Sequence, residues 1–246
     1  RRVSAGTSES DRRPARFLGA VFAGGGSTRM GGDKALMEWP LANGGTVPLF
    51  IRAAQVLDGF CERVEISVGS RGPRPGIDGA AWPTFPDALE GAGPLAGLAA
   101  GLGRAADLGL DGVLALACDM PFVDESDFAP LLALLREGAD VALWTVEAAD
   151  GKVWDQPLVA AYSVACAPAV REALSSGARR LVAIEGRAAA NGRQLAFARL
   201  PASENSSLRL VNVNTPSDYD SARAAAVRLS SESGSGSPWV PGLSNS

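Results

Sequence analysis

Short apolar runs of strand length alternate with helical patterns along most of this chain, and this alternation limits its possible folds more than any other feature. FLGAVFA at 17–23, RVEISV at 63–68 and VLALA at 113–117 indicate strands, the last buried on both faces. Helical patterns lie between them, at 48–57 and at 94–106. Such units favour an α/β fold with a single doubly wound, mostly parallel sheet and helices on both faces.

The second half of the chain continues the pattern. We expect a helix at 124–138, strands at 141–146 and 157–162, and a last helix at 215–227. Both helices open with a residue suited to the N-cap and an acidic residue three positions on. In sheets of this kind ligands bind beyond the carboxyl ends of the strands, so the residues that follow each strand are the first candidates for function.

The two ends of the chain differ in composition from its body. Residues 1–16 are rich in Arg and Ser, and residues 229–246 form a Gly-, Ser- and Pro-rich stretch. We expect both segments to be disordered. The body at 17–228 shows no internal repeat and reads as one domain.

The chain contains no histidine. This excludes Ser-His-Asp and Cys-His nucleophilic catalysis, a histidine general base and histidine-ligated zinc. Any chemistry must therefore use carboxylates, Lys and Arg side chains, backbone amides and a hard metal that prefers oxygen ligands.

The charge of the chain and its cysteines indicate which kinds of partner it can bind and in which cellular compartment it works. The net charge is −4 although residues 1–16 hold five arginines, so the body is acidic and we expect no nucleic-acid partner. Three widely spaced cysteines without a CxxC pair favour a reducing cytoplasm over a disulfide framework. No run of 18 apolar residues occurs, so we expect no membrane span.

A glycine-rich loop follows the first strand. It begins with Ala23, continues through consecutive glycines into Ser27, and carries the cations Arg29 and Lys34; its glycines are Gly24, Gly25 and Gly26. Exposed amides of such a loop form a nest for phosphate oxygens, which the two cations would complement. The loop lacks the Walker A pattern, because Lys34 precedes an alanine. The alternative is a flexible turn with two solvated cations.

Asp119 follows the strand at 113–117 directly. A carboxylate at the tip of a central strand is well placed to hold Mg²⁺ that bridges phosphates. The alternative is that Asp119 caps the next segment, but Asp124 already suits that role. Cys118 reads as a small buried apolar residue rather than a nucleophile.

A second glycine-rich junction contains Asp87, Gly93, Pro94 and Gly97. Asp87 could accept hydrogen bonds from a guanine edge or a ribose, and the turn could let a base lie close to the backbone. A Gly-Pro helix start accounts for Gly93 and Pro94 equally well.

Further polar residues cluster late in the chain. Asp155 precedes a strand, Arg179 and Arg180 lie between helical stretches, and Asn212 and Asn214 alternate in an extended segment, so that both point one way. The two amides suit a ligand with ring nitrogens and phosphate, or they satisfy buried backbone groups.

Five motifs together resemble the molybdenum cofactor guanylyltransferases of the nucleotidyltransferase superfamily. They are AGGGSTRMGGDKAL at 23–36, GPLAGL at 93–98, CDMPFV at 118–123, DQPLVAAY at 155–162 and VNVNTPSDY at 211–219. The match spans about 17–228 in the family's order. It implies a Rossmann-like nucleotidyltransferase fold.

The resemblance also implies roles for individual residues. The loop around Ala23, Gly24 and Gly25 would bind GTP phosphates beside the catalytic candidates Lys34 and Arg29. Asp87 would contact guanosine, and Asp119 would bind Mg²⁺ and GTP. The residues expected to face the molybdopterin are Asp155, Arg179, Arg180, Asn212 and Asn214.

The implied reaction is transfer of GMP from GTP to molybdenum-molybdopterin, with molybdenum-insertion and molybdoenzyme-maturation proteins as further partners. Alternatives are a cytidylyltransferase for the same pterin, a guanylyltransferase for another small phosphate, and a non-catalytic relative that delivers cofactor. The sequence departs from the family at Gly69–Arg71, where an Asn is usual, at Gln156, where a His is common, and in a longer insert at 39–46.

Overall fold

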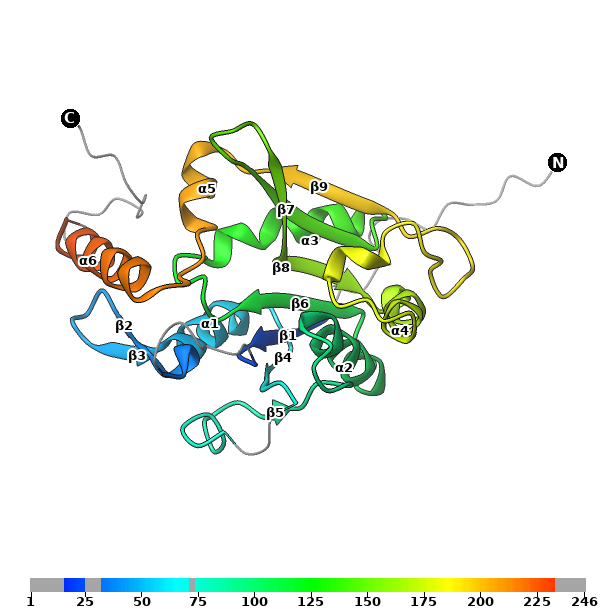
Figure 1. Cartoon of the computed structure of the whole chain (residues 1–246), viewed down its shortest axis with the longest axis horizontal. Helices are drawn as coiled ribbons and strands as arrows, with labels where there is room; N and C mark the ends of the chain where they lie inside the picture. Colours follow the sequence, from blue (N-terminus) through cyan, green and yellow to red (C-terminus); the bar gives the residue numbers. More distant parts are fainter. Residues whose placement is uncertain (1–15, 25–31, 71–73, 233–246) are drawn as a thin grey trace.

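A seven-stranded sheet forms the centre of the computed structural model, which describes residues 16–24, 32–70 and 74–232. Within these residues the strand order is β5-β4-β1-β6-β8-β7-β9 (Figure 1). The strands are β1 Phe17–Phe22, β4 Arg63–Ser67, β5 Thr84–Phe85, β6 Gly112–Ala117, β7 Val141–Glu147, β8 Val153–Ser163 and β9 Phe197–Pro201.

The sheet is mostly parallel, as the sequence predicts. β1 pairs in parallel with both β4 and β6, and β4 with β5. β8 is the exception, because it runs antiparallel to both of its neighbours, β6 and β7. The start of β8 therefore lies at the same edge of the sheet as the ends of β1, β4 and β6.

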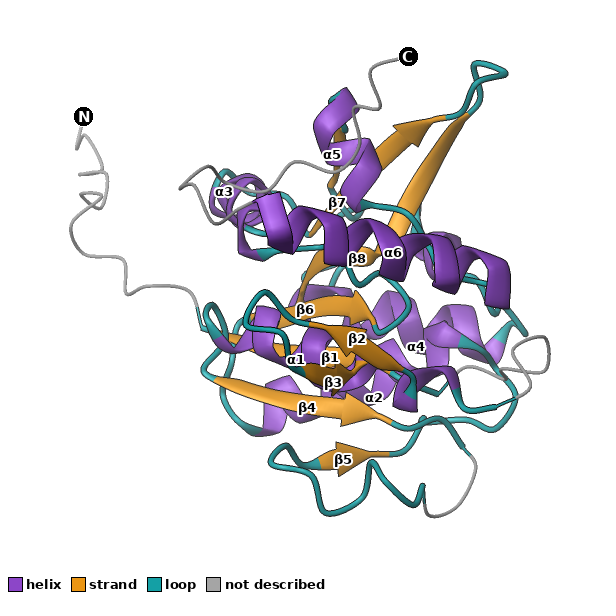
Figure 2. Cartoon of the chain, turned by 90° about the vertical axis from the view of Figure 1, so that its left-hand side faces the viewer, coloured by secondary structure: helices purple, strands orange, loops and turns teal. Residues whose placement is uncertain are grey.

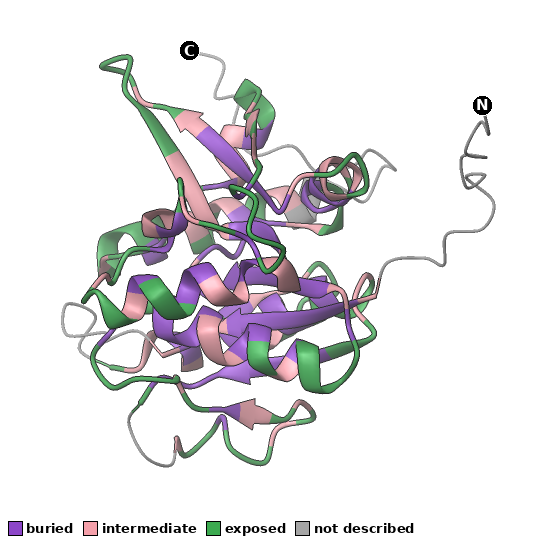
Figure 3. Ribbon diagram, turned by 90° about the vertical axis from the view of Figure 1, so that its right-hand side faces the viewer, coloured by how far each residue is buried: buried purple, intermediate pink, exposed green. Residues whose placement is uncertain are grey.

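Helices cover both faces of the sheet, as expected. α1 (Leu49–Asp58) and α3 (Ala129–Arg136) pack on one face, while α2 (Pro94–Asp107) and α4 (Ala167–Ser175) pack on the other. Side chains of β1 alternate between the two cores, with Val21 in the first and Leu18 in the second. The central strands are buried on both faces (Figure 3).

A smaller layer lies beside the carboxyl edge of the sheet. The short strands β2 (Glu38–Pro40) and β3 (Thr46–Pro48) form an antiparallel hairpin, and α6 (Pro216–Glu232) packs against β2 (Figure 2). Trp39 meets Phe122 edge to face with ring centroids 5.1 Å apart, and Val213 joins the same cluster. α5 (Glu204–Arg209) precedes α6 in the chain.

One buried carboxylate on β4 is held by two arginines. Glu65 is fully buried, accepts a 2.5 Å bond from Arg63 Nε and is also bonded by Arg104 from α2, with Nη2 2.8 Å from Oε1. Burial alone would raise the pKa of Glu65, but these hydrogen bonds outweigh it and the pKa is lowered. The pair ties α2 to the sheet.

The structure modifies several expected elements. The helix expected at 124–138 is divided into a 3-10 helix, Glu125–Asp127, which has the predicted capping box, and α3, because Pro130 begins a new first turn. α6 continues to Glu232, so residues 229–232 of the expected tail are helical. Residues 1–15 and 233–246 lie outside the described residues. The sequence patterns missed the β2–β3 hairpin, β5, β9 and α5, whereas α4 is the helical stretch expected before Arg179.

Candidate functional site

A cavity of about 890 Å³ opens at the carboxyl edge of the sheet. It lies beyond β1, β4 and β6, beside the start of β8 and at the N-terminus of α2, where the strand connections meet. Ten of the residues proposed from the sequence line it: Ala23, Gly24, Lys34, Asp87, Gly93, Pro94, Asp119, Asp155, Asn212 and Asn214. The residues thus come together from across the whole domain.

Lys34 joins two distant segments at this cavity. Its Nζ donates to Asp119 Oδ2 at 3.1 Å and to Asn214 Oδ1 at 3.0 Å, and its side chain is only 14% exposed. Asp33 caps the 3-10 helix Lys34–Leu36 by accepting a 3.1 Å bond from Ala35 N, which fixes the backbone that carries the lysine. The carbonyl of Asp119 accepts from Val213 N at 2.8 Å, so the segment 212–214 is held against the tip of β6.

Arg74 connects the two ends of the glycine-rich loop. Its guanidinium donates to the carbonyls of Ala23 and Val68, both at 3.1 Å, and forms an ion pair with Asp33. The side chain is 11% exposed. Arg74 was not proposed from the sequence, because no local pattern connects it to partners about 40 and 50 residues earlier. The predictions for Gly25, Gly26, Ser27 and Arg29 fall outside the described residues.

Gly24 packs directly on the loop that follows β4. A Cβ atom at Gly24 would lie 2.6 Å from Gly69 N and 2.7 Å from Gly69 Cα, closer than real side chains approach. Gly69 has φ +76°, a conformation that favours glycine. Glycine is thus required at both positions for this backbone contact, which brings the ends of β1 and β4 together.

Asp87 lies against the N-terminal part of α2. Its Oδ1 accepts a 3.0 Å bond from Ser67 Oγ, and its amide donates to Gly69 O at 3.2 Å. Burial raises the pKa of Asp87, partly opposed by the Ser67 bond. Gly97 does not line the cavity, but a Cβ there would come within 2.8 Å of Phe22 and 3.1 Å of Asp87 Oδ1, so glycine permits this approach.

The start of α2 was interpreted from the sequence in two ways, as a Gly-Pro helix start and as a turn beside a bound base. Gly93 precedes the helix with φ +67° and Pro94 is its first residue, as a Gly-Pro helix start requires. Both residues also line the cavity. The Gly-Pro helix start is therefore confirmed, and a contact of the same two residues with a ligand is compatible with it.

The second-half residues divide into two groups. Asn212, Asn214 and Asp155 line the cavity, whereas Arg179 and Arg180 are exposed and do not. Arg179 instead lies against Gly91 and Gly93 at the start of α2.

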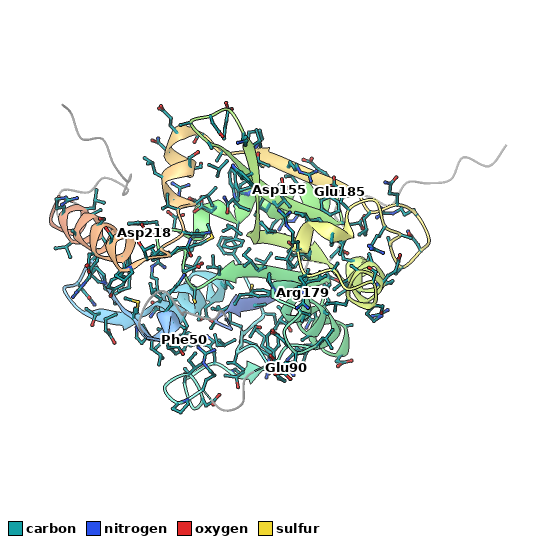
Figure 4. The ribbon with its side chains drawn as sticks, in the orientation of Figure 1. Phe50, Glu90, Asp155, Arg179, Glu185 and Asp218 are labelled. Atoms are coloured by element: carbon teal, nitrogen blue, oxygen red, sulfur yellow. The ribbon has the colours of Figure 1, made fainter. Side chains whose placement is uncertain are left out.

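Asp155 is held by an ion-pair network. Arg199 donates to both of its carboxylate oxygens, at 2.9 and 3.0 Å, and to both oxygens of Glu185, at 2.9 and 2.7 Å. In Figure 4 Asp155 and Glu185 lie next to each other, with Arg179 closer to α2. The sequence patterns missed Arg199 and Glu185, and also Ser67, Ser70 and Trp154, which line the cavity or support it.

The donor set of the cavity suits a metal that is bound mainly through a ligand. Among residues 16–24, 32–70 and 74–232 no group of three or more His, Cys, Asp or Glu side chains could hold an ion. Asp119 presents a single carboxylate, and its Oδ1 accepts no hydrogen bond from the described residues. One carboxylate completed by phosphate oxygens and water is a usual magnesium environment.

Cys118 lines the cavity but is a buried thiol. Burial raises the pKa of the Cys118 thiol well above its ordinary value, as expected for an apolar packing residue, and none of the three cysteines is in a disulfide.

No helix in the described part of the chain is long and apolar enough to cross a membrane.

Comparison with solved structures supports the fold. The structure is similar to molybdopterin-guanine dinucleotide biosynthesis protein A from Archaeoglobus fulgidus, with a TM-score of 0.65 and 20% identity over 87% of this chain and all of that one. It is also similar to 2-C-methyl-D-erythritol 4-phosphate cytidylyltransferase from Thermus thermophilus, with a TM-score of 0.60 and 17% identity over 85% of this chain and 98% of that one.

Sequence comparison identifies the family. The probable molybdenum cofactor guanylyltransferase of Pelotomaculum thermopropionicum is 35% identical over 210 residues, which are 85% of this chain and 92% of the relative. The molybdenum cofactor guanylyltransferase of Cereibacter sphaeroides is 36% identical over 204 residues, 82% of this chain and 93% of the relative. Residues 19–192 match the MobA-like NTP transferase domain. The chain therefore belongs to the MobA-like NTP transferases, a family of nucleotidyltransferase enzymes.

Proposed function

We propose that this protein is a molybdenum cofactor guanylyltransferase, which transfers GMP from GTP to molybdenum-molybdopterin and releases pyrophosphate. The observation that carries the proposal is the contact of Lys34 with Asp119 in a cavity that Asp87 also lines. A cation, a carboxylate and a base-binding candidate are the groups that a Mg·GTP site needs. The names of the similar proteins support the choice of guanylyl transfer to this cofactor.

Transfer needs little covalent help from the protein. The terminal phosphate of molybdenum-molybdopterin attacks the α-phosphorus of GTP, the new phosphoanhydride bond forms, and the bond to the pyrophosphate oxygen breaks. A phosphate nucleophile is already ionised at neutral pH, so no general base is required, in keeping with a chain without histidine. Lys34 and the backbone amides at Ala23 and Gly24 would stabilise the charge of the phosphates.

Asp119 is the residue that would hold Mg²⁺, which supplies charge neutralisation on the phosphates when it is bound. Its Oδ2 already contacts Lys34 and its Oδ1 is directed by no described partner, so the carboxylate has an oxygen available for an ion. The glycine-loop residues Gly25, Gly26, Ser27 and Arg29 complete the proposed phosphate site. Asn212 and Asn214 are proposed to face the second substrate together with Asp155, Arg179 and Arg180.

Asp87 is the proposed reader of the guanine base. A carboxylate matches the N1–H and 2-amino donors of guanine, whereas cytosine lacks this pair of adjacent donors. Gly93 and Pro94 at the start of α2 leave backbone surface beside it, and Gly97 keeps the helix close. This argument favours GTP over the cytidylyl alternative.

The cellular setting is proposed from the same chemistry. Three free thiols agree with a reducing cytoplasm, and an acidic body disfavours nucleic acid. Molybdenum-insertion and molybdoenzyme-maturation proteins are the proposed further partners.

The test is calorimetry with GTP, CTP and ATP, each with Mg²⁺, followed by a pyrophosphate-release assay with molybdenum-molybdopterin. We expect clear preference for GTP, weaker binding by Lys34→Ala, and no turnover by Asp119→Ala. Lys152→Ala is the matched control, since Lys152 is the only other lysine and lies exposed next to the β7–β8 turn. Tighter binding of CTP would indicate a cytidylyltransferase for the same pterin. GTP binding without pyrophosphate release would indicate a non-catalytic relative that delivers the cofactor.

A further inference from the structure

Trp154 is a large aromatic side chain that lines the cavity and yet is 53% exposed. In the described part of the chain its ring makes no aromatic or cation–π contact and its indole N–H donates to no residue. Trp39 and Trp144 are buried, and Trp82 is half-buried against a hydrophobic core. An indole face left open in a cavity that charged and amide side chains also line is a surface for a flat ligand.

The backbone holds Trp154 in a defined position. On β8 it pairs with Val146 of β7, and Gln156, on the same face of the strand, pairs with Trp144. The neighbouring Asp155 is clamped by Arg199, which is itself held by Glu185. The ring is thus mounted on a fixed strand, which lowers the entropy cost of stacking against it.

The position of β8 in the sheet separates Trp154 from the proposed guanine site. Asp87 is held by Ser67 at the end of β4, and β1 and β6 lie between β4 and β8. Three strand spacings amount to about 14 Å. Lys34 and Asp119 lie at the intervening strand ends, where the phosphates of the nucleotide are expected. The base of the same nucleotide therefore points away from β8.

We propose that Trp154 stacks on the ring system of the pterin substrate and determines its binding. This inference rests on the proposed function and extends it to the second substrate. A pterin is flat and polarisable and carries amide-like edges, so it can stack on the indole while side-chain amides meet its edge. Gln156 and Asn212 line the same cavity and supply such amides.

The experiment compares wild type with Trp154→Ala, Trp154→Phe and Val153→Ala. Val153 is the matched control because it is the adjacent residue on the same strand, is 61% exposed and does not line the cavity. For each protein we would measure GTP affinity by calorimetry and the KM and kcat for molybdenum-molybdopterin. Quenching of tryptophan fluorescence by a stable oxidised pterin monophosphate gives a readout that needs no turnover.

For Trp154→Ala we expect the KM for the pterin substrate to rise about tenfold or more, with GTP affinity unchanged. Trp154→Phe should retain most of the affinity, Val153→Ala should behave as wild type, and both Trp154 variants should lose the share of the pterin quenching that comes from Trp154. Weakened GTP binding in Trp154→Ala would overturn the proposal, because the indole would then stack on guanine. Unchanged kinetics and unchanged quenching would also overturn it and assign the exposed ring to a protein partner.

Failure of the proposed function gives a different result. A wild-type protein that shows Trp154-dependent quenching by the pterin but transfers no guanylyl group would contradict the guanylyltransferase assignment while supporting the pterin site. Normal turnover with no effect of Trp154→Ala would support the guanylyltransferase assignment and contradict the pterin site at Trp154.

Discussion

Replacing Gly24 by alanine would place a methyl group inside the contact between the ends of β1 and β4. Its Cβ would lie 2.7 Å from Gly69 Cα and 2.6 Å from Gly69 N. Carbon atoms pack at about 3.5–4.0 Å, so the two backbones must separate by about 1 Å. Neither side of the contact can rotate away, because both partners are main chain.

The displacement reaches the proposed base site. Gly69 O accepts the amide hydrogen of Asp87, so movement of Gly69 shifts the carboxylate that would read guanine. Overpacking of this kind costs about 1–3 kcal/mol. If about 1.4 kcal/mol of that appears in nucleotide binding, affinity for GTP falls about tenfold. We expect calorimetry with Mg·GTP to show this loss, and urea unfolding to show a lower midpoint.

Gly103→Ala is the matched control. Gly103 lies on the exposed side of α2, and a Cβ there would meet nothing within 4 Å. Alanine should stabilise the helix by about 0.5–1 kcal/mol and leave GTP binding unchanged. A Gly24→Ala protein with wild-type GTP affinity and an unchanged urea midpoint would refute the reasoning, since the strand ends would then separate at no cost.

Three further predictions concern groups around the same sheet. Because burial raises the pKa of Asp87, its carboxylate is protonated at a higher pH than an ordinary Asp, so GTP affinity should decrease at acidic pH in wild type. Asp87→Asn should bind GTP weakly and without this pH dependence, as titrations across acidic pH can show. Arg104→Met leaves the fully buried Glu65 with Arg63 alone and should cost about 2 kcal/mol in urea unfolding at neutral pH. The pKa of Glu65 is lowered in the folded state, so this contribution is present above its ordinary value of 4.5 and is lost as the pH falls from there through the lowered pKa; an Arg104→Met deficit that does not shrink as the pH is lowered through that range would contradict the assignment. Arg74→Lys replaces the three guanidinium nitrogens, which reach two carbonyls and the Asp33 carboxylate from different sides, by a single ammonium nitrogen; it should weaken GTP binding about tenfold with little change in unfolding, which calorimetry and urea titration would separate.

Local patterns predicted the elements whose signals lie within a few residues. Thr215 and Asp218 form the capping box expected from their spacing, with bonds of 3.1 and 2.8 Å, and the buried run at 113–117 is a central strand. Of the two edge strands, β5 was missed because it has only two residues, and β9, with the sequence FARLP, because it has neither a continuous apolar run nor a regular alternation.

The candidate site was predictable only in part, because many of its contacts join residues that are far apart in the sequence. Strand-end position brought Asp119 and Lys34 to notice, and the structure joins them across 85 residues of sequence. No local pattern indicates that Arg199 would reach Asp155 or that Arg74 would reach Asp33, since these pairs depend on how the sheet is assembled. The sequence identified the Trp39–Thr46 insert only as longer than usual in the family, and the structure shows that it forms a hairpin whose Trp39 packs against Phe122.

The order of strands in the sheet also has a consequence for how the protein is made. β1 emerges first during synthesis and pairs with β4, but its other edge stays open until β6 is available, where Phe17 pairs with Gly112. Among the strands that pair on both sides in the finished sheet, β1 is therefore the one that waits longest with an unprotected edge. Folding dominated by such distant pairings is slow, so the nascent chain should depend on chaperones more than the stability of the folded enzyme would indicate.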